Sequence, residues 1–224
     1  CRAHTPIPIL GKMFRYLASQ TKTNICCHVD HGYTLDECYE GIDSGFTSVM
    51  FDGSKLTLKE NIKISKKIAS RAHKHNISVE GEIGFVGYDN GKISEGTNIE
   101  DAVTFANKSN IDAMAISVGN THLQTSKKAS IDFNKINLIE AKTKIPLVLH
   151  GSSGIPVEQR KKLARKTKIA KLNIGTEIRM TFGEALRKNL KNNPKTYDRL
   201  QLLKPTIKDL TKVTKKIIKQ IGPN

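Results

Sequence analysis

Hydrophobic and polar positions alternate along the chain in two different periods. Short runs of β-branched and other apolar residues are separated by longer stretches in which apolar residues recur every three or four positions. The clearest long stretch is 58–76, where isoleucines and alanines fill the apolar positions and lysines the polar ones. Strands that alternate with helices predict βαβ units, and therefore a parallel sheet.

Six strand–helix units follow from this pattern. The predicted strands cover residues 24–29, 47–51, 77–82, 112–118, 145–150 and 169–173. The predicted helices cover residues 36–44, 58–76, 98–109, 132–143, 157–167, 176–192 and 204–220. A glycine-rich stretch, 84–96, predicts a flexible loop. An open doubly wound sheet and an eight-stranded barrel both fit the pattern, and neither a G-x-G-x-x-G turn nor a Walker A motif is present.

The net charge of +16 raises the question of a polyanionic partner. The lysines are dispersed over predicted helix faces and also crowd the last stretch, 204–219, but no aromatic residues are interleaved with them for stacking on single strands. We therefore favour a lysine-rich solvated surface and expect no nucleic-acid partner, although positive potential would attract phosphorylated substrates. No apolar run approaches the ~20 residues that span a bilayer, which predicts a protein without membrane segments.

The cysteines indicate a reducing environment. Cys26 and Cys27 are adjacent within an apolar run, and no spacing among the four cysteines suggests a metal site. We interpret them as small buried residues of a chain without disulfides, and expect a cytoplasmic protein.

Polar residues gather where the predicted strands end, which is where α/β folds place their chemistry. The groups at the six strand ends include, in chain order, Asp30 and His31, Asp52, Glu82, Asn120 and His122, His150, and Asn173. Three imidazoles at one edge suit a catalytic zinc ion, which takes three protein ligands. The alternative is three unrelated loop histidines. We expect His28 to be packed within its strand, and His73 and His75 to face solvent.

Small and hydroxyl-bearing residues follow the last two strands. The segments 151–154 (GSSG) and 173–176 (NIGT) suit phosphate binding, because small side chains let backbone N–H groups approach the oxygens. The alternative is a pair of ordinary tight turns.

Taken in order, these residues resemble one family. The matching stretches are His28–Gly32 (HVDHG), 45–54 (GFTSVMFDGS), 79–84 (VEGEIG), 119–122 (GNTH), 145–154 (IPLVLHGSSG) and 171–176 (KLNIGT). The sequence resembles the class II, metal-dependent ketose-bisphosphate aldolases, which act on fructose or tagatose 1,6-bisphosphate. The resemblance implies a (β/α)8 TIM barrel in which residues 1–224 form a single domain of about six βα units, with the first unit and most of the second lying upstream of Cys1.

The resemblance also implies roles for individual residues. His31, His122 and His150 match the zinc ligands, and Asp30 matches the catalytic acid/base. Asp52 and Glu82 match positions that hold a second divalent or a monovalent cation in some members. The positions that match the dihydroxyacetone phosphate site are Leu123, Gly151, Ser152, Ser153, Asn173, Ile174, Gly175 and Thr176. Leu123 stands where the family usually has glycine, and Asp89 or Asp52 stands for the acid of the glycine-rich loop.

The implied activity is that of a lyase of glycolysis. It reversibly cleaves fructose 1,6-bisphosphate to dihydroxyacetone phosphate and glyceraldehyde 3-phosphate by zinc-stabilised enediolate chemistry. The alternatives are tagatose 1,6-bisphosphate as substrate, an inactive homologue, or a basic nucleic-acid-binding protein. The family resemblance further implies a homodimer or homotetramer, and we expect the last helix, 204–220, to pack on its own barrel.

Overall fold

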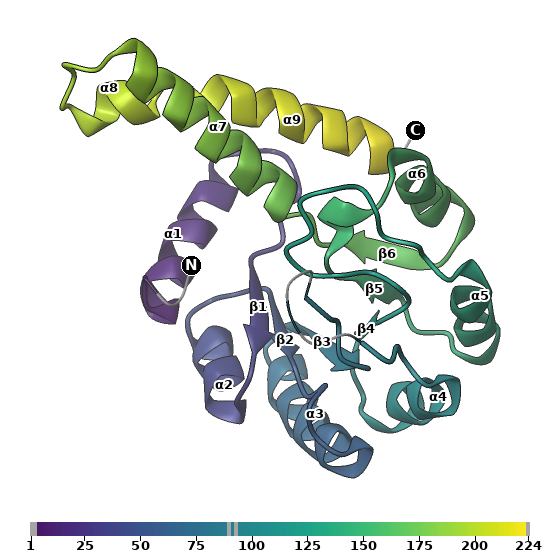
Figure 1. Ribbon diagram of the computed structural model, residues 1–224. Coiled ribbons are helices and arrows are strands. Elements are labelled where there is room, and N and C mark those ends of the chain that lie inside the picture. Colours follow the sequence, from purple (N-terminus) through teal and green to yellow (C-terminus); the bar gives the residue numbers. More distant parts are fainter. Residues whose placement is uncertain (1–3, 89–90, 92–93, 223–224) are drawn as a thin grey trace.

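Six parallel strands curve into half of a barrel in the computed structural model, which describes residues 4–88, 91 and 94–222 (Figure 1). The strands are β1 (His28–Gly32), β2 (Ser48–Phe51), β3 (Ser78–Ile83), β4 (Ala113–Ile116), β5 (Leu147–Leu149) and β6 (Ile169–Leu172). Each strand pairs with the next one in the chain, so β1 and β6 form the two edges of the sheet among the described residues. This arrangement is the predicted TIM barrel in partial form.

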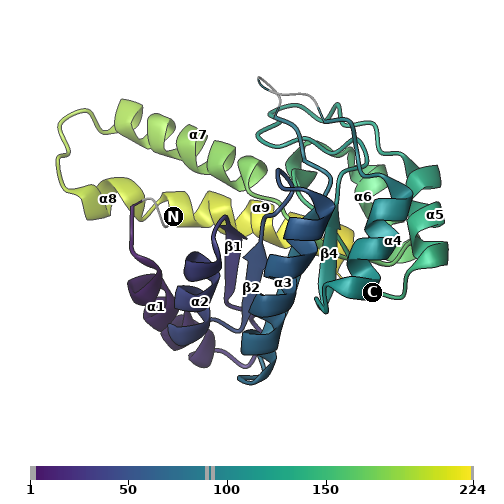
Figure 2. The same cartoon turned by 90° about the horizontal axis from the view of Figure 1, so that it is seen from below.

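Helices cover the outer face of the half-barrel and extend beyond it. The α-helices are α1 (Ile7–Ser19), α2 (Leu35–Asp43), α3 (Leu58–His73), α4 (Ile99–Lys108), α5 (Phe133–Lys142), α6 (Val157–Lys166), α7 (Thr176–Asn192), α8 (Arg199–Leu203) and α9 (Thr206–Ile221). Helices α2 to α6 surround the sheet, whereas α7 and α9 run side by side as an arm that ends at α8 (Figures 1 and 2). Helix α9 packs against α6 and α7, which confirms its expected place on its own chain.

The local sequence explains where several helices begin. Thr57 and Glu60 form a reciprocal capping box at the start of α3. The side chains of Asn98 and Asp132 accept hydrogen bonds from the first turns of α4 and α5. These starts agree with the predicted boundaries, because the capping residues are recognisable from the chain alone.

The two faces of the sheet bury different kinds of side chain. Side chains that point outward, such as Val29 and Val79, join a large apolar cluster with the helices. The apolar cluster on the inner side is small and contains, among the described residues, Met50, Ala115 and Val148, with Ala113 against it. Polar side chains occupy other inner positions, as the contacts of Glu80 below show. The barrel interior therefore has a small apolar layer and a polar end.

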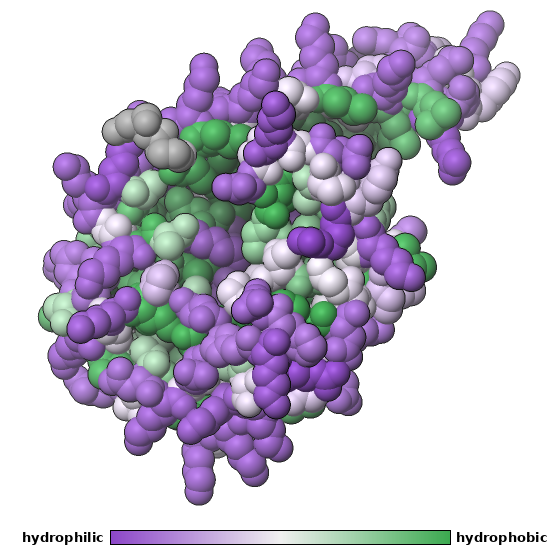
Figure 3. All heavy atoms as spheres, turned by 180° about the vertical axis from the view of Figure 1, so that it is seen from behind, coloured by the Kyte–Doolittle hydropathy of each residue, from purple (hydrophilic) through white to green (hydrophobic). Residues whose placement is uncertain are grey.

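Hydrophilic side chains dominate the surface. They cover most of the face seen from behind, with hydrophobic side chains gathered in a few patches (Figure 3). On α9 the exposed lysines are Lys208, Lys212, Lys215, Lys216 and Lys219. His73 and His75 are exposed as predicted. No helix in the described part of the chain is both long and apolar enough to cross a membrane.

Three local predictions were wrong. Strand β1 begins at His28 rather than at residue 24, so Asp30 and His31 belong to the strand instead of following it. The short helix α8 was not predicted. Cys26 is exposed, whereas Cys27 and Cys38 are buried; these three are free thiols, and Cys1 lies outside the described residues. The edge position of β1 explains the first error, since its start is set by pairing with Ser48 of β2 rather than by its own apolar run.

Candidate active site

Three histidines from distant parts of the chain meet at the carboxyl ends of the strands. Nε2 of His31 lies 2.9 Å from Nδ1 of His150. The ring centroid of His122 lies 5.3 Å from that of His31 and 5.8 Å from that of His150. One nitrogen from each ring lies within 4.8 Å of the others. The three predicted ligand candidates therefore converge, and the alternative of three unrelated loop histidines is excluded.

An irregular end to β1 aims His31 at this cluster. The register between β1 and β2 shifts between Val29 and Gly32, and His31 has a positive φ of 52°. A residue with a side chain in the left-handed region costs about 1–2 kcal/mol. A bulge of this kind re-aims a side chain at the rim of a barrel.

Carboxylates fix which nitrogen of two histidines faces the cluster. Nδ1 of His31 lies 2.8 Å from Oδ2 of Asp52, and Nε2 of His150 lies 2.8 Å from Oε1 of Glu80. A ring N–H that donates to a carboxylate leaves the other nitrogen with its lone pair free. The atoms available for a metal are therefore Nε2 of His31 and Nδ1 of His150, the same two atoms that lie 2.9 Å apart.

Glu80 belongs to a polar network inside the half-barrel. Its second oxygen, Oε2, accepts a hydrogen bond of 2.7 Å from Nζ of Lys171, and that Nζ lies 3.2 Å from Nε2 of His28. Burial acts to raise the pKa of Glu80, but the hydrogen bond with His150 and the charge of Lys171 outweigh it and lower the pKa to about 2. Burial, followed by the charge of Lys171, lowers the pKa of His28 to about 4. A carboxylate and a neutral imidazole thus lie beneath the cluster.

Sequence reasoning did not find Glu80. The signal was present in the alternation Val79-Glu80-Gly81-Glu82, because residues two apart on a strand share one face. His28, expected to be packed, is in fact half-buried and hydrogen-bonded to Ser48 and Lys171.

Asp52 and Glu82 form a second group of potential ligands with His31. Glu82 is 1% exposed, and its Oε2 has no hydrogen-bond partner within the described residues. Burial, and then the charge of Asp52, raise the pKa of Glu82 to about 8. This carboxylate oxygen lies 3.8 Å from Nδ1 of His31, and such nitrogen and oxygen donors together fit a divalent cation. The residues present therefore suit a metal ion.

Asp30 lies beside the histidines on the inner side of β1. Its Oδ1 accepts a hydrogen bond of 3.2 Å from Nδ2 of Asn173, which also lies 3.2 Å from Nε2 of His150. Asp30 is otherwise exposed and can reach a bound molecule. The predicted acid/base and one predicted substrate-binding residue are thus neighbours of the metal candidates.

The two predicted phosphate segments lie side by side. Residues Ser152–Gly154 form a short 3-10 turn (η1), in which the N–H of Ser152 donates to the carbonyl of Asn173 at 3.0 Å. The N–H groups of Ser153, Ile174, Gly175 and Thr176 have no acceptor among the described residues. Gly175 is the N-cap and Thr176 the first residue of helix α7, whose N-terminal dipole favours an anion.

Two backbone positions shape the loops around this region. Gly151 has a φ of 62°, and a Cβ there would overlap the carbonyl of Thr121. Leu123 also has a positive φ, 57°, and its side chain is 54% exposed. A left-handed backbone is one that glycine adopts without strain, so the leucine at position 123 is held in an unfavourable conformation.

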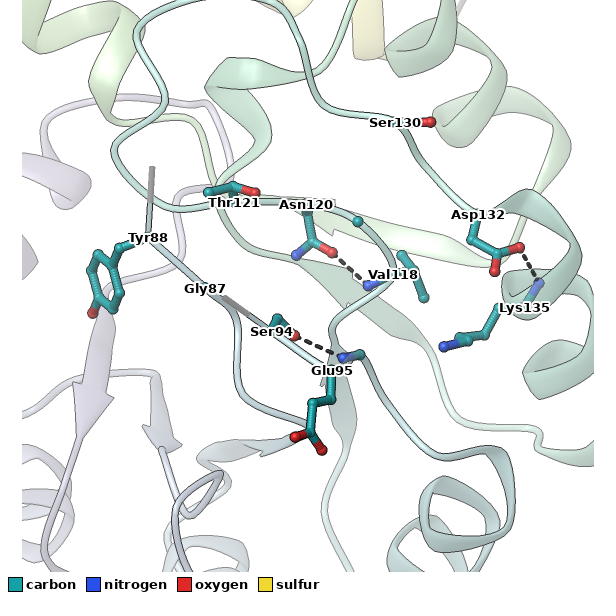
Figure 4. Close-up of a pocket in the computed structure, with 12 residues that line it drawn as sticks. Gly87, Tyr88, Ser94, Glu95, Val118, Asn120, Thr121, Ser130, Asp132 and Lys135 are labelled. Atoms are coloured by element: carbon teal, nitrogen blue, oxygen red, sulfur yellow. Dashed lines mark hydrogen bonds between the residues drawn. The ribbon is translucent and has the colours of Figure 1, made fainter. Parts of the chain in front are cut away.

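A polar cavity of about 480 Å³ is lined by Asn120 and Thr121, which precede His122 in the chain (Figure 4). It opens between the segment that carries Gly87 and Ser94 and the segment that carries Asn120 and Lys135. Tyr88 forms an isolated β-bridge with His122, and the centroids of their rings are 5.1 Å apart. Asp89, one candidate for the acid of this loop, lies outside the described residues.

Comparison with known proteins places the chain among aldolases. The family model for class II fructose-bisphosphate aldolases matches residues 2–224. A relative from Shouchella clausii, named 6-phospho-5-dehydro-2-deoxy-D-gluconate aldolase, is 37% identical over 201 residues, which are 88% of this chain and 68% of the relative. A fructose-bisphosphate aldolase from Staphylococcus aureus is 34% identical over 202 residues, covering 88% of this chain and 70% of the relative.

A solved structure agrees with the family match and with the two relatives. The crystal structure of the YdjI aldolase from Escherichia coli matches 98% of this chain and 78% of its own with a TM-score of 0.82 and 27% identity. The predicted lyase class is confirmed, and class II aldolases are generally metal-dependent enzymes of phosphorylated sugars. The half-barrel with its three converging histidines thus belongs to the class II fructose-bisphosphate aldolase family.

Proposed function

We propose that this protein reversibly cleaves fructose 1,6-bisphosphate into dihydroxyacetone phosphate and glyceraldehyde 3-phosphate. The observation that carries the proposal is the convergence of His31, His122 and His150, near Asp30 and near backbone N–H groups that have no acceptor among the described residues. Aldol cleavage needs these three functions together: charge stabilisation, proton transfer and an anchor for phosphate.

In this proposal the three histidines hold a zinc ion, and Asp52 and Glu82 hold a second cation or orient the first site. A bound divalent metal supplies Lewis-acid stabilisation of the negative charge that develops on substrate oxygens. Asp52 and Glu80 keep His31 and His150 in the tautomers that present Nε2 and Nδ1 to the centre.

Asp30 takes the proton of the substrate hydroxyl at C4 during cleavage and returns it during condensation. Its carboxylate is exposed and accepts a hydrogen bond from Asn173, which holds it beside the histidines while leaving it open to the substrate. The N–H groups of Ser153, Ile174, Gly175 and Thr176 bind the phosphate, with Gly151, Ser152, Asn173 and Leu123 shaping the site around it. This anchoring fixes the orientation of the bond that breaks.

A second substrate is favoured by the names of similar proteins. 6-Phospho-5-dehydro-2-deoxy-D-gluconate shares the phosphorylated hydroxyketone half of fructose 1,6-bisphosphate but carries a carboxylate instead of a phosphate at the far end. The same metal centre and phosphate loops serve both molecules. Tagatose 1,6-bisphosphate, the third candidate, differs from the fructose compound in the configuration of one carbon.

Cleavage assays with all three substrates test the proposal. Dihydroxyacetone phosphate released from each is measured with a coupled dehydrogenase, with and without a metal chelator. We expect the highest kcat/KM with fructose 1,6-bisphosphate and loss of activity on chelation. Preference for the deoxygluconate compound would keep the aldolase and replace the substrate. Chelator-resistant cleavage, or none with any of the three, would overturn the proposal.

A further inference from the structure

Arg160 is a fully buried cation behind the two phosphate segments. It lies on α6, and its side chain is 0% exposed. Its Nε donates to the carbonyl of Ile155 at 3.0 Å, and its Nη2 donates to the carbonyl of Ser153 at 2.8 Å. The same Nη2 donates to Oε2 of Glu177 at 2.6 Å. One guanidinium therefore contacts the end of the η1 turn and the first turn of α7.

Glu177 completes the connection between the two segments. Its backbone N–H donates to Oγ of Ser153 at 3.1 Å, and its carboxylate also accepts a hydrogen bond of 3.1 Å from Nζ of Lys127. The loop 151–155 and the start of α7 are thus joined through Ser153, Arg160 and Glu177, in addition to the backbone hydrogen bond from Ser152 to Asn173. The N–H groups of Ser153 and Thr176, which have no acceptor in the described part of the chain, lie on the two segments so joined.

A charged arginine is not needed at position 160 simply to fill the space in the core. Its Nη1 is buried without a hydrogen-bond partner among the described residues, which is unfavourable for a charged group. Buried ion pairs can often be replaced by apolar side chains of similar volume without loss of stability. A planar guanidinium differs from such side chains in one respect: its donors have a fixed fork geometry, so it can set the relative position of several acceptors.

We propose that Arg160 is a positioning residue for phosphate binding. Its fork holds the carbonyls of Ser153 and Ile155 and the carboxylate of Glu177, so that the N–H groups of the two segments point at one phosphate monoester. Arg160 does not touch the substrate. The inference deepens the proposed function, since it rests on these segments being the phosphate site.

The consequence is a selective loss of phosphate affinity. Arg160→Met keeps a long side chain but removes the fork, so the two segments keep only the hydrogen bonds from Ser152 to Asn173 and from Glu177 to Ser153, and their relative position is less tightly fixed. We expect KM for dihydroxyacetone phosphate in the condensation direction to rise roughly tenfold, which corresponds to about 1.4 kcal/mol. The rate of condensation with unphosphorylated dihydroxyacetone, and the zinc content after loading, should match those of the wild type, because neither depends on the phosphate loops.

Three further variants separate positioning from simple destabilisation. Arg160→Lys keeps the charge without the fork, so we expect it to behave like Arg160→Met. Glu177→Gln, on the partly exposed side of the pair, keeps an acceptor for Arg160 and should raise KM less while folding normally. Lys161→Met on the same helix is the matched control, because Lys161 pairs only with the exposed Glu158 among the described residues, and should change nothing.

The readouts are KM and kcat for the two donors, and binding of inorganic phosphate followed by 31P NMR. A raised KM and weakened phosphate binding in Arg160→Met and Arg160→Lys, with unphosphorylated turnover intact, support the proposal. Wild-type phosphate affinity in both variants, restored affinity in Arg160→Lys, or equal losses for both donors would overturn it. If the wild-type protein itself neither binds phosphate nor prefers the phosphorylated donor, the phosphate site of the proposed function fails first.

Discussion

Removing the charge of Glu80 tests how the metal candidates are oriented. Glu80 is 3% exposed and connects Nε2 of His150 with Nζ of Lys171 through contacts of 2.8 and 2.7 Å. Glu80→Gln keeps an oxygen for the N–H of His150. It also places an amide group near the ammonium of Lys171, so one charge-assisted contact becomes a donor facing a donor.

The expected loss follows from these contacts. Substituting a residue that orients a metal ligand typically costs 10–100-fold in metal affinity, which is about 1.4–2.7 kcal/mol. We expect the loss of metal affinity to be near tenfold for Glu80→Gln, since His150 keeps an acceptor. For Glu80→Ala we expect a loss near 100-fold, since His150 then has no acceptor at this position. The side chain of Lys171 is 35% exposed and can hydrate, so the free energy of unfolding of the apoprotein should fall by only about 1–3 kcal/mol.

A competition titration against a chromogenic chelator measures the zinc dissociation constant, and urea unfolding of the metal-free protein measures stability. Glu158→Gln is the control, because it removes the same charge from the exposed surface of α6. A zinc affinity within twofold of wild type in Glu80→Ala, with an intact fold, would refute the orienting role of Glu80.

Three further outcomes follow from the geometry. Asp30→Asn should bind zinc as wild type while kcat falls at least 100-fold, as measured by elemental analysis and the cleavage assay; normal turnover would exclude proton transfer by Asp30. Leu123→Gly should raise the free energy of unfolding by about 0.5–1 kcal/mol in urea titrations. The substitution relieves the strain of a left-handed backbone at residue 123 and removes an exposed side chain that contributes little burial. Burial acts to raise the pKa of Glu177, but the hydrogen bonds from Arg160 and Lys127 lower it below its ordinary 4.5. The ionised Glu177 therefore stabilises the fold above about pH 4.5, and this stabilisation is lost as pH falls through its lowered pKa. The difference in free energy of unfolding between wild type and Glu177→Gln should therefore shrink on acidification from pH 7. A difference that does not change with pH would contradict this.

Much of the fold was predictable because its determinants are local. The capping residues Thr57, Asn98 and Asp132 mark helix starts within one or two positions, and the period of apolar residues separates strands from helices. The site was partly predictable because parallel strands end at one edge, which brought His31, His122 and His150 together without knowledge of any contact.

The rest depends on pairings between distant positions. Glu80 and His150 are 70 residues apart, and Arg160 and Glu177 are 17 apart on different helices. Nothing in the local pattern around Arg160 distinguishes it from a surface arginine of a basic helix. The bulge that turns His31 inward likewise arises from pairing with β2 and not from the HVDHG sequence alone.

The central claim is that His31, His122 and His150 hold one divalent metal ion on which cleavage depends. Its most direct test is elemental analysis of the purified protein after dialysis, paired with fructose 1,6-bisphosphate cleavage before and after chelation. We predict close to one zinc per chain, loss of cleavage with the chelator, and recovery when zinc is restored. Cleavage that persists in the metal-free protein, or zinc that remains bound when all three histidines are replaced by alanine, would contradict the account.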